Sequence, residues 1–175
     1  MADTTTSPLA ALPERLRTAI ARNGICVDVV SQSEAAHTAE AAARILGVPV
    51  SDIVKTLVLT DGAGRWVAAI VPGDRRLDRA KLAALVGARK LRFASGDEVL
   101  QHTGWPPGGV APLGFASEVA AVVDASLATP ADRTVIAGGG RPELLIRIAV
   151  RAVIDHHRAT VAIITEPGAG PHTDD

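Results

Sequence analysis

The sequence predicts a single domain of the mixed α/β class, built around a mixed or antiparallel sheet. Its 175 residues are the usual length of one domain. Segments with helical spacing of apolar residues are interspersed with short β-branched segments, and adjacent strands are joined by short turns. Neither Gly-x-Gly-x-x-Gly nor Gly-x-x-x-x-Gly-Lys-[Ser/Thr] occurs, which argues against a Rossmann fold and a P-loop nucleotide site.

Helices are predicted where apolar residues recur every three or four positions between capping residues. Asp78 can cap a helix whose Leu77 and Leu82 occupy hydrophobic-staple positions. Ser95 and Glu98 match a capping box at the start of another. We expect helices over 9–22, 38–46, 78–86, 95–102 and 149–156.

Strands are predicted where β-branched and other apolar residues run between turn signals. The clearest case is a hairpin, because two such runs flank Asp61-Gly62-Ala63-Gly64. The expected strands cover 25–30, 55–60, 65–71, 90–93, 119–123, 133–137, 144–148 and 160–165.

The two ends of the chain are predicted to be disordered, leaving one domain over residues 8–166. Residues 1–7 are polar, and residues 167–175 are rich in Gly, Pro and acidic residues. The start lacks a basic segment followed by an apolar one, so no signal peptide is expected. No apolar run approaches the roughly 20 residues that span a bilayer. We therefore expect a cytoplasmic protein without a membrane partner.

Composition restricts the kind of nucleic-acid binding that is possible. The formal net charge of −1 argues against a generally basic nucleic-acid coat protein but allows a local basic patch. Aromatic residues are only 2% of the chain, which disfavours an RNA platform based on base stacking. Cys26 is the single cysteine, so an intrachain disulfide and a Cys-based zinc site are excluded. We expect it to be a small buried apolar side chain.

Lys55 is the first residue with chemical promise. It stands at the head of an apolar strand, in the run Ile53-Val54-Lys55-Thr56-Leu57. One interpretation is the solvent-facing end of a strand. The other is a fixed cation that meets a phosphate or a developing negative charge.

The second promising feature is the loop from Gly104 to Gly114, which holds four glycines and three prolines in 11 residues. Such a loop is stiff, yet lets backbone come close to a ligand. The N–H groups around Gly108 and Gly109 could form an anion-binding nest or an oxyanion hole. The alternative is a simple connecting loop.

Gly138-Gly139-Gly140, directly after a predicted strand, is the third feature. It indicates either a turn that a ligand or another loop approaches closely, or a plain flexible turn. The histidines show no metal-binding spacing, and His156 and His157 are adjacent, so they point in different directions on a helix. We expect no metal and no cofactor.

A cluster of basic residues stands out against the neutral total charge. Seven bases fall within 18 positions, opposed only by Asp74 and Asp78. Such a cluster is either a solvated helix face or a patch that binds a phosphate backbone. The seven are Arg75, Arg76, Arg79, Lys81, Arg89, Lys90 and Arg92.

Several motifs follow one another in a distinctive order. They are His37-Thr-Ala-Glu, Leu46-Gly47-Val48, Ile53 to Val58, Gly73 to Leu82, Ala94 to Val99, Gly108-Gly-Val-Ala-Pro-Leu-Gly114, Val123-Asp124 and Ala137-Gly-Gly139. Over residues 25–165 the chain resembles the YbaK-like family of editing domains associated with prolyl-tRNA synthetase. Lys-Thr-Leu combined with Gly-Gly-x-x-Pro-x-Gly carries the resemblance.

The resemblance implies a compact domain with a central mixed, barrel-like sheet surrounded by helices. It also implies a free-standing hydrolase that acts in trans on mischarged tRNA bearing a small amino acid, of the Cys-tRNA(Pro) or Ala-tRNA(Pro) type. The ester would be cleaved with help from the substrate itself. The implied partner is the acceptor end of tRNA, with prolyl-tRNA synthetase as a second candidate.

Each site residue is carried over from the family's motifs. Lys55 matches the critical lysine that holds the tRNA end, and Gly108 and Pro112 match a Gly-x-x-x-Pro motif that positions the aminoacyl carbonyl. The resemblance gives Asp124 a structural role. The substrate-binding glycines would be Gly104, Gly109, Gly114, Gly138 and Gly139, and the tRNA patch Arg75, Arg76, Arg79 and Lys81.

The chain also departs from the family's best-known deacylases. The glycine turn is followed by Arg141-Pro142 in place of Arg-Gly, and the loop carries Trp105-Pro106-Pro107 in place of a version with tyrosine. Two alternatives to tRNA deacylation therefore stay open. One is a non-catalytic tRNA-binding or regulatory module that keeps the pocket, and the other is a hydrolase of a different small activated acyl ester.

Overall fold

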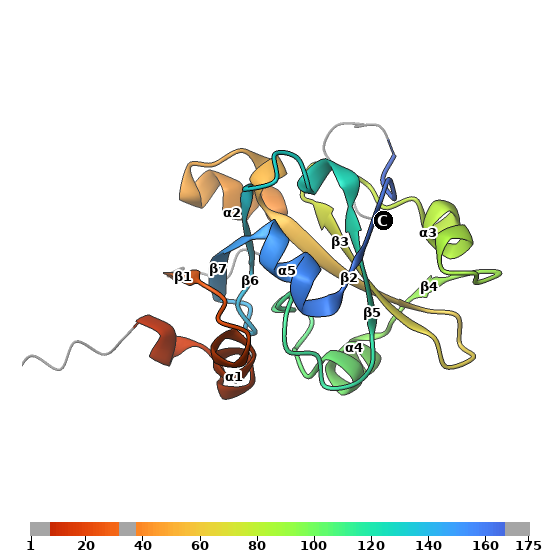
Figure 1. Cartoon of the computed structure of the whole chain (residues 1–175), viewed down its shortest axis with the longest axis horizontal. Coiled ribbons are helices and arrows are strands. Elements are labelled where there is room, and N and C mark those ends of the chain that lie inside the picture. Colours follow the sequence, from red (N-terminus) through yellow and green to blue (C-terminus); the bar gives the residue numbers. More distant parts are fainter. Residues whose placement is uncertain (1–7, 32–37, 167–175) are drawn as a thin grey trace, which may run out of the picture.

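Two sheets make up the framework of the computed structural model, which describes residues 8–31 and 38–166 (Figure 1). The ends predicted to be disordered, 1–7 and 167–175, and His37 lie outside these residues. The larger sheet has the order β4 (Arg92–Phe93), β2 (Val54–Thr60), β3 (Trp66–Pro72), β5 (Ala120–Asp124) and β8 (Thr160–Ala162). The smaller has the order β1 (Val27–Ser31), β7 (Leu144–Ala149) and β6 (Thr134–Gly138).

The larger sheet is mixed, as predicted. β2 and β3 form the expected antiparallel hairpin, whereas β3 pairs with β5, and β5 with β8, in parallel. A single parallel bridge between Ile53 and Ile136 joins the two sheets. The described strands do not close into a barrel, because β4 and β8 remain at the two edges of an open sheet. The barrel-like arrangement is therefore not confirmed.

The helices predicted to follow Asp78 and Ser95 begin at these capping residues. Asp78 accepts hydrogen bonds from the N–H groups of Ala80 and Lys81, and Ser95 and Glu98 form the capping box. Thr38 caps its helix through its hydroxyl. The helices are α1 (Glu14–Arg22), α2 (Ala39–Leu46), α3 (Arg79–Leu85), α4 (Gly96–Thr103) and α5 (Val150–His157), with short 3-10 turns η1 (Pro8–Ala11), η2 (Val50–Asp52) and η3 (Ala125–Leu127).

The larger sheet is buried on both faces, which explains the unbroken apolar run of β3. On one face Val67, Ala69 and Val71 pack in a cluster with Leu82 of α3. On the other face Ile70 packs in a cluster with α1, α5 and the second sheet. Figure 1 shows α5 crossing in front of the strands, with α2 and α3 on opposite sides of the molecule.

Three expectations need correction. The predicted helix over 9–22 is divided, because Pro13 takes the N-cap of α1 after the turn η1. The last strand ends at Ala162, since the N–H of Ile164 bonds to the side chain of Asp124 instead of continuing the ladder. Cys26 is exposed rather than buried, because alternation turns its neighbours Ile25 and Val27 toward the core.

Candidate functional site

Lys55 lies near the start of β2, on the face that α3 covers. Its side chain follows the alternation of Leu57 and Leu59, which pack in the cluster that contains Leu82. The ammonium group donates a hydrogen bond to the backbone carbonyl of Arg75, with an Nζ–O distance of 3.2 Å. Lys55 is thus held at the head of its strand and next to the basic segment that follows β3.

The junction of the two sheets places Lys55 beside the glycine turn. Ile53 of the segment before β2 bridges Ile136 of β6 in parallel register. Two residues further along each strand come Lys55 and Gly138. Matched residues in a parallel pair point to the same face, and Ile53 and Ile136 share one cluster with α2. The Lys55 side chain and the position that a side chain on Gly138 would take therefore lie on the same face.

The middle of the loop packs directly on this glycine. A β-carbon on Gly138 would lie 2.4 Å from the carbonyl oxygen of Val110, and one on Gly109 would lie 2.6 Å from the backbone of Arg141. Both distances are too short for any side chain, so glycine is required at both positions for the loop and the turn to touch. The structure thus packs Gly109 and Val110 on Gly138, and both Gly138 and Lys55 lie two residues beyond the bridge that joins the sheets.

The tip of the loop is a type II turn. Gly108 has a φ of +80° at the third position, and the N–H of Gly109 donates to the carbonyl of Pro106 at 3.0 Å. This N–H is therefore used inside the turn. The predicted nest of consecutive free N–H groups around Gly108 and Gly109 is not formed.

The rest of the loop is anchored in the core. Trp105 is only 2% exposed, and its indole N–H donates to the carbonyl of Leu113 at 2.9 Å. Pro112 is buried and lines a small apolar cavity of about 10 Å³ with Val54 and Val153, among others. Pro112 therefore anchors the loop in the core and is not exposed at the surface of the loop.

Gly104 and Gly114 lie at the two ends of the loop. Gly104 ends α4 in the left-handed conformation, with a φ of +77°, and Gly114 has a φ of +70°. β-Carbons at both would approach the side chain of Arg15 on α1. Gly139, in turn, donates its N–H to the carbonyl of Leu144 at 2.7 Å. These three glycines shape the loop and the turn.

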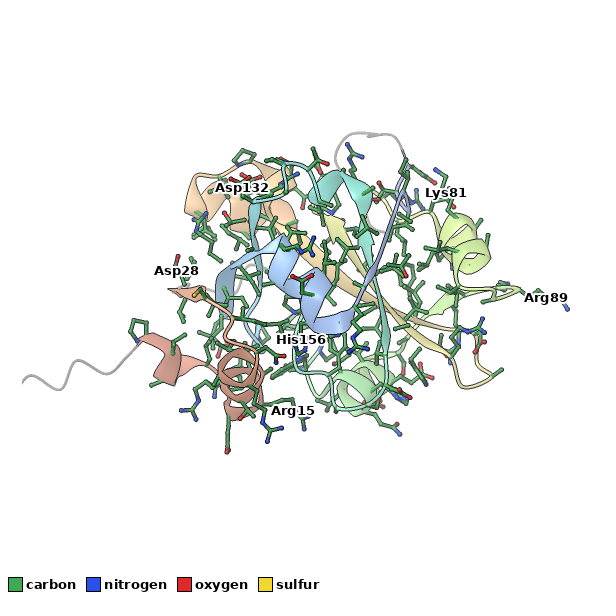
Figure 2. The ribbon with its side chains drawn as sticks, viewed as in Figure 1. Arg15, Asp28, Lys81, Arg89, Asp132 and His156 are labelled. Atoms are coloured by element: carbon green, nitrogen blue, oxygen red, sulfur yellow. The ribbon has the colours of Figure 1, made fainter. Side chains whose placement is uncertain are left out.

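Next to the end of α5, the loop meets a histidine pair. His157 Nε2 lies 2.8 Å from the carbonyl oxygen of Pro112, and its ring stacks on Phe115 with 4.7 Å between centroids. The ring of His156 contacts the His157 ring edge-on, with 4.5 Å between centroids, and the Nδ1 atom of His156 is buried without a hydrogen bond. Both histidines line a groove of about 750 Å³ between α1 and residues 114–119, in the region of Figure 2 where Arg15 and His156 are labelled.

Residues of the predicted basic cluster make contacts within the chain. Arg92 makes a two-pronged ion pair with Glu98, with both N–O distances 2.7 Å, and it lowers the pKa of Glu98 to about 2. Lys81 lies 3.6 Å from Asp78 and also donates to the carbonyl of Thr165. Arg79 lies over the ring of Phe93. Figure 2 shows Lys81 and Arg89 on the α3 side of the molecule, far from Arg15.

Asp124 ties β5 to the last segment of the chain. It is 1% exposed and accepts hydrogen bonds from Ser126, from the N–H of Ile164 and from the hydroxyl of Thr165. Burial by itself raises the pKa of Asp124, but these hydrogen bonds outweigh it and hold the pKa below its ordinary value. Such a saturated carboxylate has a structural role.

One polar group beside Lys55 escaped the sequence interpretation. The hydroxyl of Thr56 is buried and has no hydrogen-bond partner. Nothing in the sequence marks it, because threonine is an ordinary strand residue and only the packing isolates its oxygen.

Within residues 8–31 and 38–166, no three His, Cys, Asp or Glu side chains are grouped so that they could hold a metal ion.

The part of the chain that holds Lys55, the loop and the glycine turn is similar to known proteins. Residues 33–155, which include all three, match the family model of the aminoacyl-tRNA editing domain. The chain belongs to the aminoacyl-tRNA editing domain family. The resemblance stated on the motifs alone is thereby confirmed.

Among curated relatives, the chain is similar to part of proline–tRNA ligases. It is 43% identical over 90 residues to the enzyme of Trichlorobacter lovleyi, covering 51% of this chain and 16% of that one. It is 40% identical over 110 residues to the enzyme of Solidesulfovibrio magneticus, covering 62% and 19%. The chain therefore spans less than a fifth of the length of these ligases.

A solved structure matches over its whole length. It is described as a "putative trans-editing enzyme for prolyl tRNA synthetase", with 33% identity, a TM-score of 0.78, and coverage of 90% of this chain and 100% of that one. In the described part of the present chain, no helix is long and apolar enough to cross a membrane.

Proposed function

We propose that the protein hydrolyses the ester bond of mischarged tRNA that carries a small amino acid, and that it acts in trans. The observation that carries this proposal is the packing of the Gly108–Pro112 loop on Gly138, with Lys55 and Gly138 each two residues beyond the bridge that joins the sheets. The full-length match to a structure described as trans-editing supports action in trans. The preferred substrates are of the Cys-tRNA(Pro) or Ala-tRNA(Pro) type.

The chemistry asked of the site is modest. An aminoacyl ester is already activated, so orientation and polarisation of its carbonyl matter more than a strong protein nucleophile. Lys55 would bind the phosphate or the terminal adenosine of the tRNA end, and the loop would face the aminoacyl group. Gly104, Gly109, Gly114, Gly138 and Gly139 would shape the space that admits a small side chain. Water would add to the carbonyl, and the ribose hydroxyl would leave.

The basic segment beside Lys55 would extend this contact along the acceptor stem. Arg75, Arg76 and Arg79 precede or begin α3, and Lys55 bonds to the Arg75 carbonyl, so the lysine lies next to this basic segment. Prolyl-tRNA synthetase is a second candidate partner, given the similarity to proline–tRNA ligases.

A panel of mischarged tRNAs tests the proposal. Purified protein is expected to release the amino acid from at least one small-residue tRNA, and Lys55→Ala is expected to reduce the rate by a factor of about 100 or more. Lys90→Ala, which removes one exposed charge from the same side, is the matched control and should change the rate by less than about threefold. A panel left intact at high protein concentration would contradict deacylation.

A non-catalytic tRNA-binding module is the second candidate. One observation favours it: the Gly109 N–H is already bonded to Pro106, so a ready-made oxyanion hole is not present there. Binding of tRNA that depends on Lys55, without any hydrolysis, would identify this role. A minimal aminoacyl ester is the third substrate to test. If its hydrolysis rate is unchanged by charge reversal at Arg75, Arg76 and Arg79, the substrate is a different acyl ester.

A further inference from the structure

His157 reaches the loop from a separate helix. Its Nε2 lies 2.8 Å from the Pro112 carbonyl oxygen, 45 positions earlier in the chain. A carbonyl can only accept, so the ring nitrogen at this distance must carry the hydrogen and donate it. His157 therefore has its proton on Nε2.

The Pro112 carbonyl needs this donor. Pro112 is buried, and below it lies an apolar cavity of about 10 Å³ whose lining includes Val54, Ile70 and Val153. Such a cavity offers no hydrogen-bond donor and is too small and apolar to hold a useful water. A buried carbonyl left without a partner is costly, so the loop would shift to bring it to water in the neighbouring groove.

The ring is also fixed in orientation. It stacks on Phe115, three residues beyond Pro112, and meets His156 edge-on.

Burial lowers the pKa of His157 to about 4, against the opposing effect of the Pro112 hydrogen bond and with a further decrease from His156. The ring is therefore neutral at pH 7. The charged residues that line the same groove are Glu14, Arg15, Arg22 and Glu118.

We propose that His157 is a positioning residue: its Nε2–H bond to Pro112 holds the loop in the position from which Gly109 and Val110 pack on Gly138. This inference rests on the proposed function of the loop. His157 bonds to the Pro112 carbonyl and stacks on Phe115, so it would act through the loop and not on the substrate.

Two variants separate the hydrogen bond from the packing. His157→Phe keeps a ring against Phe115 but has no donor, whereas His157→Gln can present an N–H near the position of Nε2. We expect His157→Phe to lower kcat for the best mischarged tRNA about tenfold with KM within about twofold, and His157→Gln to recover most of the loss. His156→Phe, the same substitution one residue earlier, is the matched control and should leave kcat unchanged.

A second readout does not need activity. The amide shifts of residues 108–111 and 113 in the full chain should move in His157→Phe, return toward wild type in His157→Gln and stay constant in His156→Phe. Ring ¹⁵N shifts of wild type should show the Nε2–H form at pH 7. This last measurement stands even where a variant fails to fold.

Three results would overturn the inference. They are an Nδ1–H tautomer, loop shifts and kcat in His157→Phe equal to wild type, or a Gln variant as impaired in both as the Phe variant. A wild-type protein that hydrolyses no mischarged tRNA would instead contradict the proposed function, while the NMR measurements would still decide whether His157 holds the loop.

Discussion

Thr56 and Lys55 are neighbours on β2 with opposite environments. Lys55 bonds to a backbone carbonyl at the surface of the strand, whereas the Thr56 hydroxyl is buried in the sheet without a partner. A buried hydroxyl without a hydrogen bond costs free energy that an isosteric methyl group does not. Thr56 thus carries a stability cost next to the proposed site.

Thr56→Val should therefore raise the free energy of unfolding by about 1 kcal/mol. The shape of the side chain is kept, and only the unpaired oxygen is removed. Urea unfolding of the two proteins measures the difference, with Thr134→Val on the exposed start of β6 as the control. A decrease in stability would show that the hydroxyl is satisfied in solution.

At the scale of elements, the site depends on how closely one loop approaches one strand. Gly138 lies in ordinary strand conformation, so a side chain there is opposed by contact and not by backbone strain. Its closest neighbour is the backbone of Val110, which cannot rotate away as a side chain could.

Gly138→Ala should push the loop off β6. We expect a decrease of about 1–3 kcal/mol in unfolding free energy and a fall in deacylation. Gly62→Ala in the β2–β3 turn is the control, since Gly62 has open space around it and is opposed only by its φ of +75°. If Gly138→Ala and wild type have equal deacylation activity, then that activity does not depend on the contact between the loop and Gly138.

Local signals explain which elements were predictable. The hairpin, the Asp78 cap and the Ser95 capping box each depend on residues a few positions apart, and all three are confirmed. Pairing of β3 with β5 depends on contacts about 50 positions apart, which no local pattern encodes. The same holds at the site. Lys55 and the loop were identifiable as motifs, but the use of the Gly109 N–H within its turn and the His157 contact emerge only from packing.

For the whole molecule, acid should be destabilising in two separate pH ranges. The folded-state pKa of His157 is about 4, below its ordinary value of about 6.5, so the unfolded chain binds the proton more readily. Stability is complete above about pH 6.5 and falls as the pH drops toward 4. The lowered pKa of Asp124 adds a further decrease only below its ordinary value near 3.8.

The histidine contribution amounts to at most about 3 kcal/mol between pH 6.5 and 4. Unfolding free energies of wild type and His157→Gln, measured at intervals across this range, should converge as the pH falls. His156, whose pKa is also lowered by burial, is present in both proteins and does not affect the comparison. Parallel pH profiles would contradict the assignment.

A neutral molecule with a basic surface should bind tRNA in a salt-dependent way. Arg75 is half-buried, whereas Arg76 and Arg79 are exposed, although the net charge of the chain is −1. Replacing all three by Gln should weaken binding and reduce the slope of log K against log salt by about 0.7–0.9 for each phosphate group that the variant no longer neutralises. Filter binding at several salt concentrations measures the slope, and an unchanged slope would place the tRNA elsewhere.

A parallel bridge between Ile53 and Ile136 joins the two sheets, and each sheet contributes a different part of the proposed site. The five-stranded sheet supplies the cation, and the three-stranded sheet supplies the glycine wall on which the loop rests. Little backbone pairing between the described strands crosses this seam, so the relative position of the two sheets depends mainly on the side-chain core that they share. A change of side-chain volume in this shared core should therefore move the glycine turn relative to Lys55.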